Sequence, residues 1–536
     1  MTSPPPLRFK IASEPHEIDQ IRRLSYRTFV EEIPQHAANR DGALVDRFES
    51  DNTYAICLRG RAVVGMISVC GKRPFSLDSK LANLDSYLPP GSSLCEVRLL
   101  AVEPSHRTGV VFRGLTMCLA KHSLRAGYDL ALISGTERQL QLYRHIGFVP
   151  FGQTVGTVEA RFQPMYLTLE TFRETGRAFV QRASDGPLVS YLPGPVALDP
   201  DVRRAMQMTP VSHRGAPFIE ELTEARSALC KLTGASRVQL LLGSGTLAND
   251  AVGGQLAALG GVGLVLSNGE FGARLVNHAS RWGLDYMLVE QEWGSPLSRE
   301  VVRVALDGDK RIKWVWAVHC ETSTGIVNDL EMLRALCSER AVRLCLDCIS
   351  SIGAIPANLQ DVYLATGVSG KALGAPAGIA LVFHNHEILP SFTLPRYLDL
   401  GLYAESEGAP FTQSSSLLRA LRTAVLHACD RAVPSPAVTE DAAWLREELR
   451  ANGFRIVAAD DVTSPAVTTI ALPHGVSSDG LGARLEEDGF AVSYRSGYLR
   501  SRNWIQICLM GNYRRDCLGS LVDALADLTE SGIAAS

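Results

Sequence analysis

The segment Ser369-Gly370-Lys371-Ala372-Leu373-Gly374-Ala375-Pro376 lies between two apolar runs of the chain. The run before it, Val342-Arg343-Leu344-Cys345-Leu346, ends at Asp347. Around these two segments, apolar runs of strand length alternate with amphipathic stretches of helical length. The other runs are residues 238–242, 263–266, 314–318 and 378–383. This alternation predicts an α/β fold with a mostly parallel sheet and helices on both of its faces.

The chain is too long for one hydrophobic core. Its 536 residues and 58.1 kDa indicate at least two folding units. A polar segment, Thr175 to Asp185, ends at Gly186-Pro187 and marks the expected boundary. The predicted parts are a mixed α/β domain at 1–182, a linker at 183–190, a large domain at 191–425 and a small C-terminal α/β domain at 426–536.

Composition is that of an ordinary globular protein. Hydrophobic residues make up 46% of the chain and charged residues 21%, with a net charge of -4, so we expect no nucleic-acid partner. We find neither a leader segment nor an apolar stretch long enough to cross a bilayer, which predicts a cytoplasmic protein with no membrane partner. Twelve cysteines are scattered singly, which favours free thiols and no metal site.

Lys371 and Asp347 together have the chemistry that pyridoxal phosphate requires. A lysine holds the aldehyde as a Schiff base, and an aspartate keeps the pyridine nitrogen protonated. A glycine-rich turn, Gly243 to Asp250, follows an apolar run and opens a predicted helix, where it can bind a phosphate. Such a turn alone is more often an ordinary connection between a strand and a helix, without a bound ligand. The order of turn, strand-end aspartate and lysine favours one site at the carboxyl edge of one sheet.

The stretch from Tyr191 to about Gly511 resembles the class V family of fold-type I aminotransferases, near the alanine–glyoxylate, serine–glyoxylate and 2-aminoethylphosphonate–pyruvate transaminases. Eight blocks match in order. They are LPGPVALDPDVRRAM (192–206), SHRGAPF (212–218), GSGTLAND (243–250), NGEFGAR (268–274), HCETSTGI (319–326), LDCISSIGAIP (346–356), SGKALGAPAG (369–378) and PFTQSSSLLRAL (410–421). The resemblance implies transamination with pyridoxal phosphate, using a small-molecule amino donor and a keto acid.

The resemblance also assigns roles to individual residues. Lys371 would form the Schiff base and Asp347 would face the pyridinium. The other implied contacts are Ser244, Gly245 and Thr246 with the phosphate, Phe271 stacked on the ring, Thr322 and Ser323 near the ring oxygen, and Thr412 and Gln413 at the phosphate of a neighbouring subunit. The last pair implies a homodimer. From the residues alone, Phe271 would more often be core packing, and the two hydroxyls at 322 and 323 would more often cap a turn.

One position departs from the family pattern. Relatives carry an arginine in the pattern R-I-G, where it pairs with the substrate carboxylate, and this chain has Gln506 there. A neutral amide cannot replace a two-pronged cation. Either the carboxylate is bound elsewhere, with Arg495, Arg500 and Arg502 as candidates, or the substrate lacks it.

The first domain has a different resemblance. Residues 95–104 are predicted to form a strand that ends in a loop, and a helix is predicted from Arg107 through Leu124. This order resembles the acyl-CoA-binding segment of the GNAT superfamily of N-acyltransferases. Of the usual glycine-rich turn motif of that superfamily, this chain keeps only Gly109. Further matches are RRLSYRTFVEE (22–32), Asp46-Arg47-Phe48, Glu96-Val97-Arg98 and Leu142 to Phe148. Together they resemble the branch with acyl-homoserine-lactone and N-acyl amino acid synthases over most of residues 8–170.

This second resemblance implies an acyl-CoA or other acyl thioester as co-substrate, bound in part at Gly109. Acyl transfer to an amine needs a base near the amine and an acid for the leaving thiolate. Glu96 is the candidate base and Tyr143 the candidate acid. Each has a structural alternative, because Glu96 also suits a paired carboxylate beside Arg98, and Tyr143 also suits packing against the sheet.

The fusion of the two domains favours a bifunctional enzyme that makes an amine by transamination and then N-acylates it. One rival is a lyase or decarboxylase that uses the same cofactor, with a non-catalytic acyl-CoA-sensing first domain. Another is a scaffold with both sites inactive, which the presence of Lys371 and Asp347 argues against.

Overall fold

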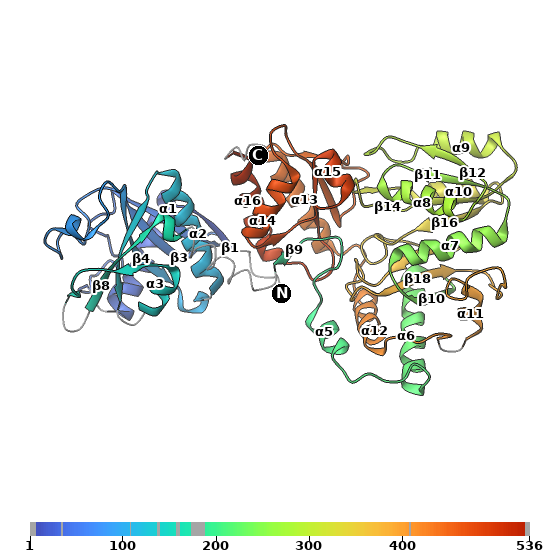
Figure 1. Cartoon of the computed structure of the whole chain (residues 1–536), viewed down its shortest axis with the longest axis horizontal. Coiled ribbons are helices and arrows are strands. Elements are labelled where there is room, and N and C mark those ends of the chain that lie inside the picture. The colour runs from blue at the N-terminus through green and yellow to red at the C-terminus, as the bar shows by residue number, and fades with distance from the viewer. Residues whose placement is uncertain are drawn as a thin grey trace. The chain divides into compact units, whose positions relative to one another are not determined.

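The computed structural model describes residues 7–33, 36–107, 109–136, 140–156, 161–172, 188–406 and 409–530. The chain divides into two compact units (Figure 1). The N-terminal unit comprises Met1–Pro187 with Arg515–Asp523, and the C-terminal unit comprises Leu188–Arg514 with Ala524–Ser536. The predicted boundary segment 175–185, and residues 183–187 of the predicted linker, lie outside the described residues, so the linker stays a prediction.

The N-terminal unit is built on one eight-stranded sheet of order β1-β2-β3-β4-β5-β8-β6, with β7 paired to β8. Its strands are β1 (Leu7–Ile11), β2 (Asn52–Arg59), β3 (Ala62–Cys70), β4 (Leu94–Val102), β5 (Leu130–Thr136), β6 (Val149–Pro150), β7 (Val155–Gly156) and β8 (Arg161–Thr168). Its helices are α1 (Pro15–Tyr26), which continues as a π-helix (Arg27–Glu32), α2 (Gly109–Arg125) and α3 (Leu140–Ile146). The predicted helix from Arg107 therefore begins at Gly109, after a 3-10 turn at Pro104–His106, and Thr108 lies outside the described residues.

Apolar helix faces cover both sides of this sheet. Ile21 and Leu24 of α1 pack with Ile56 and Met66 in one buried cluster. In a second cluster, Val111, Leu115 and Leu119 of α2 pack against other residues of β2 and β3. Because successive side chains of a strand point to opposite faces, both faces of the central strands are buried.

Strands β4 and β5 separate partway along their length. They pair in parallel only from Leu94 to Glu96, although β4 continues to Val102 and β5 to Thr136. Leu99 has a positive φ of 54°, and the register between β3 and β4 shifts beside it. A β-bulge bends a strand and increases its twist, so the irregularity at Leu99 turns β4 away from β5.

The C-terminal unit contains a seven-stranded sheet of order β10-β18-β17-β16-β13-β11-β12. The strands are β10 (Arg237–Leu242), β11 (Val262–Ser267), β12 (Tyr286–Glu290), β13 (Ile312–Val318), β16 (Arg343–Asp347), β17 (Leu364–Val368) and β18 (Ile379–His384). The pairs from β12 through β17 are parallel, and β18 is antiparallel to both of its neighbours. The predicted α/β fold with a mostly parallel sheet is confirmed.

Helices lie on both faces of the large sheet. The helices of this unit and of the chain's end are α5 (Pro200–Met206), α6 (Ala216–Thr233), α7 (Gly245–Leu259), α8 (Glu270–Arg281), α9 (Arg299–Gly308), α10 (Leu330–Ser338), α11 (Leu400–Glu405), α12 (Ser415–Cys429), α13 (Pro436–Ala451), α14 (Ser478–Glu487), α15 (Gly497–Arg502) and α16 (Leu518–Glu530). Strand β13 shows the two-sided burial directly. Trp314 and Trp316 pack with α7 and α8, whereas Val315 packs with α6, α9 and α10 on the other face.

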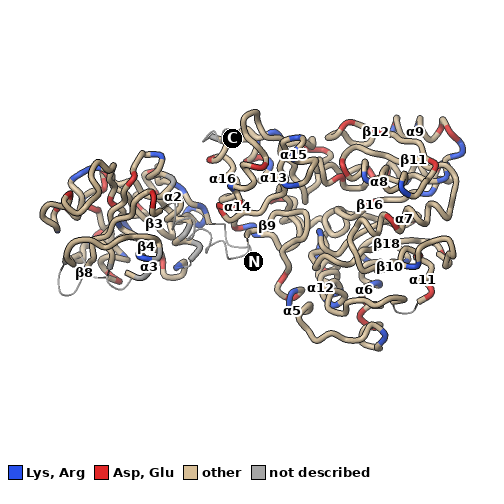
Figure 2. Tube along the Cα trace, in the orientation of Figure 1, with Lys and Arg blue, Asp and Glu red and all other residues tan. Residues whose placement is uncertain are grey.

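The remaining strands form small sheets. They are β19 (Arg455–Ile456), β20 (Val467–Ala471) and β22 (Trp504–Cys508) in one sheet, β9 (Val189–Ser190) with β21 (Phe490–Ala491), and β14 (Cys320–Glu321) with β15 (Ile326–Val327). In Figure 2, Lys and Arg are interspersed with Asp and Glu along both units, as the small net charge requires. No helix in the described part of the chain combines the length and apolar character needed to cross a membrane.

We predict that Gly263→Ala destabilises the C-terminal unit. Gly263 of β11 faces Trp314 of β13, and a Cβ at this position would lie 2.1 Å from the indole ring. Overpacking of this kind typically costs about 1–3 kcal/mol of stability. All six tryptophans lie between residues 282 and 504, so the urea midpoint followed by tryptophan fluorescence reports on this unit alone.

The matched control is Gly308→Ala at the end of α9, where a Cβ would meet nothing within 4 Å. We expect its urea midpoint to stay the same or to rise. An unchanged midpoint for Gly263→Ala would contradict the packing of β11 against β13.

Candidate active sites

The candidate cofactor residues meet at the carboxyl edge of the large sheet. Asp347 is the last residue of β16, and Lys371 follows β17 by three residues. The glycine-rich turn joins β10 to α7, and residues 319–323 follow β13. Because β10 is antiparallel to β18, as is β17, all four of these strands end at the same edge. This edge is where open α/β sheets bind ligands.

Lys371 is held by a neighbouring hydroxyl. Its Nζ donates a hydrogen bond of 2.8 Å to Ser350 Oγ and lies 5.1 Å from the centroid of the Phe271 ring. Removal of the ammonium from water lowers the pKa of Lys371, while the negative charge of Asp347 opposes that shift. The amine is therefore easier to deprotonate than an ordinary lysine.

Asp347 is a buried carboxylate that only neutral groups contact. It is 5% exposed and accepts hydrogen bonds of 2.9 Å from Asn249 Nδ2 and from the backbone N–H of Ile349. Asn249 is oriented in turn by Thr366, whose hydroxyl donates to Asn249 Oδ1 at 3.0 Å. Within the described ranges, no Lys, Arg or His forms an ion pair with Asp347. A cationic ring nitrogen would supply the missing partner.

The start of α7 suits an oxyanion. Ser244 is its N-cap residue, yet the hydroxyl of Ser244 makes no capping bond, and both Ser244 and Thr246 are exposed. Gly245 is buried, and a Cβ there would lie 2.5 Å from the Ile349 side chain. Backbone N–H groups at a helix start and two free hydroxyls are typical of phosphate sites.

Thr322 and Ser323 are buried beside these groups. The Thr322 hydroxyl donates to Ser350 Oγ, the same oxygen that contacts Lys371. Ser323 donates to the fully buried Glu321, which also accepts from the backbone N–H groups of Phe271 and Gly272 at 3.2 and 3.0 Å. Burial raises the pKa of Glu321, and these hydrogen bonds oppose that shift. Glu321 thus fixes the start of α8 and the position of Phe271.

Thr412 and Gln413 lie in the segment that precedes α12. Thr412 is exposed, whereas Gln413 Nε2 donates to the backbone oxygen of Leu240 at 2.7 Å within the same chain. Their expected contact with a neighbouring subunit stays a prediction.

Gln506 is fully buried in β22, and its amide is engaged. Its Nε2 donates to Thr469 Oγ1 at 2.9 Å and contacts the backbone oxygens of residues 322 and 323. Its Oε1 accepts from the hydroxyl of Tyr498 at 3.0 Å. The Tyr498 ring packs edge-on against Phe271, with centroids 6.4 Å apart. The position of the family arginine is therefore occupied by a neutral amide bound to an aromatic wall.

The three candidate arginines do not converge on Lys371. Arg495 pairs with Glu486 at 2.7 Å and Arg500 with Asp479 at 2.8 Å, both on the surface. Arg502 lies 3.8 Å from the centroid of the Trp293 ring. Sequence reasoning missed Arg274, whose guanidinium lies 4.8 Å from the centroid of the Phe271 ring that Lys371 also contacts.

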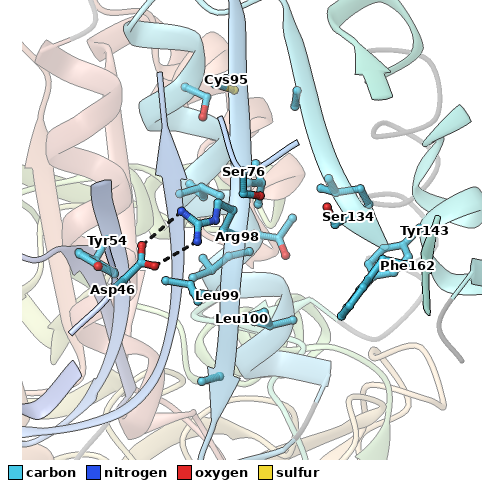
Figure 3. Close-up of a pocket in the computed structure, with 18 of the residues that line it drawn as sticks. Asp46, Tyr54, Ser76, Cys95, Arg98, Leu99, Leu100, Ser134, Tyr143 and Phe162 are labelled. Atoms are coloured by element: carbon cyan, nitrogen blue, oxygen red, sulfur yellow. Dashed lines mark hydrogen bonds and ion pairs between the residues drawn. The ribbon is translucent and has the colours of Figure 1, made fainter. Parts of the chain in front are cut away.

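The N-terminal unit contains a large cavity where β4 and β5 separate (Figure 3). Its volume is about 2280 Å³. The lining includes residues 97–102 of β4 and Ile133 and Ser134 of β5. The prediction of a site at this part of the fold therefore corresponds to a real opening in the sheet.

Glu96 is fully buried at the start of this opening. It accepts hydrogen bonds from Ser76 N at 2.7 Å, Ser76 Oγ at 2.6 Å and Leu77 N at 3.2 Å. Arg98 Nε lies 3.8 Å from its carboxylate. These contacts favour the structural alternative, in which Glu96 anchors the loop at 76–77.

Tyr143 of α3 lines the cavity beside Ser134 and Phe162 (Figure 3). Gly135 makes this approach possible, because a Cβ there would lie 2.8 Å from the Tyr143 ring. The ring also packs edge-on against Phe148. Gly109 is the first residue of α2, and its expected contact with the acyl thioester stays a prediction.

Two family models match the chain, one in each unit. Fold and site define a transferase of the pyridoxal phosphate type in the C-terminal unit: residues 204–401 match the family "Aminotransferase class-V", which implies pyridoxal phosphate as cofactor. Residues 20–169 match the family "N-acyl amino acid synthase FeeM". The chain therefore combines a domain that matches N-acyl amino acid synthases with a domain that matches class V aminotransferases, and it is an enzyme with small-molecule substrates.

Individual relatives match the C-terminal part. The soluble hydrogenase 42 kDa subunit of Anabaena cylindrica is 29% identical over 318 residues, covering 56% of this chain and 83% of the relative. A 2-aminoethylphosphonate–pyruvate transaminase of Paraburkholderia phymatum is 29% identical over 245 residues, covering 44% and 66%. The solved alanine–glyoxylate aminotransferase of Nostoc sp. is 28% identical, with a TM-score of 0.60 over 64% of this chain and 95% of that chain.

We predict that Lys371→Met stabilises the cofactor-free protein at pH 7. Because folding lowers the pKa of Lys371, the unfolded chain binds more protons between the folded pKa and the ordinary value of about 10.4. The loss of folding free energy caused by the buried ammonium is complete below the pKa of the folded state. It disappears as the pH rises towards the pKa of the unfolded state. The gain in urea midpoint should therefore shrink between pH 7 and pH 10. Lys310→Met, at an exposed lysine, is the control; a gain independent of pH would contradict the burial of this ammonium.

We predict that Glu96→Gln lowers the unfolding temperature of the N-terminal unit. The amide would present N–H donors to the donors at residues 76 and 77, and each unsatisfied buried group costs about 1–3 kcal/mol. Calorimetric unfolding measures the effect, with the exposed Glu31→Gln as control. A variant with normal unfolding but lost acyl transfer would instead identify Glu96 as the base.

Proposed function

We propose that the C-terminal unit transfers an amino group to a carbonyl compound, and that the N-terminal unit acylates the resulting amine from an acyl thioester. The observation that carries the proposal is that Lys371 and the buried Asp347 lie at one edge of the same sheet, in a chain whose other unit holds a cavity of about 2280 Å³. The co-occurrence of the two matched families supports the coupling.

The described residues fit pyridoxal phosphate. The buried Asp347 lacks a cationic partner among them, the α7 start has free hydroxyls, and Lys371 lies over an aromatic ring. The backbone at Gly194 also packs closely against the lysine segment, since a Cβ at Gly194 would lie 2.8 Å from the oxygen of Gly370. Bound there, the cofactor would stabilise negative charge on the carbon next to the substrate nitrogen.

The chain's own residues perform the remaining tasks of transamination. Asp347 holds the proton of the ring nitrogen, and Asn249 keeps its carboxylate oriented. Ser244, Gly245 and Thr246 bind the phosphate, and Phe271 positions the ring. Lys371 Nζ, with its lowered pKa, would accept the proton that leaves the substrate carbon. Ser350, itself bonded to Thr322, aims the lysine.

In the N-terminal unit the amine nitrogen attacks the thioester carbonyl. The new C–N bond forms as the C–S bond breaks, the nitrogen loses one proton, and the thiolate gains one. Tyr143, on the cavity wall, is the proposed donor of that proton. The start of α2 at Gly109 is the proposed contact for the carrier's phosphates.

We also propose a homodimer in which Thr412 contacts the cofactor phosphate of the second subunit. Thr412 is exposed in this chain, as such a contact requires. Leu389 and Phe392, in the same unit, are also exposed, at 69% and 109%. Large exposed apolar side chains are typical of protein interfaces.

We predict that the nitrogen of an amino donor reaches an N-acyl product. Purified protein with pyridoxal phosphate is incubated with ¹⁵N-labelled amino acids, a panel of keto acids and aldehydes, and acyl-CoA, and the product is analysed by mass spectrometry. Lys371→Ala should abolish transfer of the label and the absorbance of the bound cofactor, while added amines are still acylated. Tyr143→Phe should keep the transfer of the label to the amine and the absorbance of the bound cofactor, but it should lose acylation of amines.

Two outcomes would contradict the proposal. If no amine leads to consumption of the acyl thioester, the coupling is wrong and the first domain acts as a sensor. If the donor releases carbon dioxide without passing its nitrogen to an acceptor, the C-terminal unit is a decarboxylase.

A further inference from the structure

Two cations on the cavity wall of the N-terminal unit form no ion pair with any carboxylate of the described residues. Arg47 and Lys80 both line the cavity and both are accessible to solvent. Arg47 contacts Ser79 Oγ at 3.4 Å and lies 4.5 Å from the centroid of the Phe48 ring. Lys80 Nζ lies 5.3 Å from the centroid of the Phe162 ring. In the part of the chain that the structure describes, neither cation forms an ion pair.

The acids nearest to these cations are already used. Asp46 makes a two-pronged ion pair with Arg98 at 3.1 and 3.2 Å (Figure 3), and Glu96 lies 3.8 Å from the same arginine. Arg98 is therefore neutralised, whereas Arg47 and Lys80 are not. A cavity wall with unpaired cations raises the local concentration of anions.

The electrostatics around Lys80 support this reading. Partial removal from water lowers the pKa of Lys80, and the negative charge of Glu96 opposes that shift; the positive charges of Arg98 and Arg47 are smaller influences that lower the pKa further. The positive charges of Arg98 and Arg47 therefore both act on Lys80, beside the attraction of Glu96. An anion bound between the cations would relieve that repulsion.

The position of these cations selects the amine rather than the acyl donor. Lys80 Nζ lies over the ring of Phe162, and Phe162 and Tyr143, the proposed acid, both line the cavity (Figure 3). Glu96, the carboxylate that Lys80 feels, lies near the start of β4, whereas the proposed thioester turn follows its end at Val102. Six residues of strand separate these two points by roughly 20 Å.

We propose that Arg47 and Lys80 bind an oxyanion, a carboxylate or a phosphonate, that the amine acceptor carries. This inference rests on the proposed acylation. It makes the N-terminal unit the place where an anionic amine is selected. Charge-assisted hydrogen bonds from an arginine and a lysine supply the specificity.

The test compares two product analogues that differ only in charge, N-decanoylglycine and N-decanoylglycinamide. Calorimetric titration of the full chain measures the dissociation constant of each. We expect wild-type protein to prefer the acid by roughly tenfold or more, since a hydrogen bond to a charged group is worth a factor of about 10 to 100. Lys80→Gln and Arg47→Gln should each reduce the preference, and the double variant should abolish it.

Lys72→Gln is the matched control, because Lys72 is an exposed lysine outside the cavity whose ion pair is with Asp51. It should keep the wild-type preference. Binding of the amide to each variant shows that the N-terminal unit is folded. Because titration needs no turnover, a preference that depends on Arg47 and Lys80 would stand even if acylation were not observed.

Three results would overturn the proposal. They are a wild-type protein that does not bind the acid more tightly than the amide, a double variant that keeps the preference, and variants whose binding of acyl-CoA weakens instead. The last result would mean that the cations hold the phosphates of the donor.

Discussion

The charge of Asp347 is the constraint on which the C-terminal site depends. This carboxylate is buried at the end of β16 and meets only the amide of Asn249 and a backbone N–H. Burying an unpaired charge is costly, so a protein retains it where a ligand supplies the partner. Asn249, oriented by Thr366, directs the carboxylate into the same edge of the sheet where Lys371 and the start of α7 lie.

In the enzyme that we propose, the N-terminal unit recognises the charge of the substrate, and the C-terminal site lacks the family arginine. In the C-terminal unit, Gln506 occupies the position of the family arginine and uses its amide on Thr469, Tyr498 and the backbone. In the N-terminal unit, Arg47 and Lys80 face a cavity without counter-ions in the described structure. An enzyme that makes an amine with loose selection in one site and acylates it with strict selection in the other would still yield a defined product.

Much of the fold was predictable from the sequence, and the failures have physical reasons. The runs at 238–242, 263–266, 314–318, 342–346 and 378–383 are strands, because strands buried on both faces are continuous apolar stretches. Strand β12 was missed because it is an edge strand with exposed residues such as Met287 and Leu288. Strand β17, of sequence LATGV, contains a threonine and a glycine and gives a weak signal.

The site residues divide in the same way. Lys371 and Asp347 were recognisable because their chemistry is specific and their order along the chain matches the sheet. Asn249, Glu321 and Ser350 lie inside motifs that the sequence showed, but their roles depend on contacts with residues 28 to 98 positions away. The Gln506 amide has all of its hydrogen-bond partners from other segments, and Arg47 forms no ion pair in the described structure. Both properties depend on tertiary packing, so no local sequence pattern predicts them.

The most direct measurement is to locate the lysine that binds the cofactor. Protein loaded with pyridoxal phosphate is reduced with borohydride, digested, and mapped by mass spectrometry. We predict a phosphopyridoxyl group on Lys371 of the wild-type protein. In Asp347→Ala protein, which should not retain the cofactor, we predict that the peptide with Lys371 carries no label. A label on a different lysine, or no label in protein that is folded and saturated with cofactor, would contradict the assignment of this site.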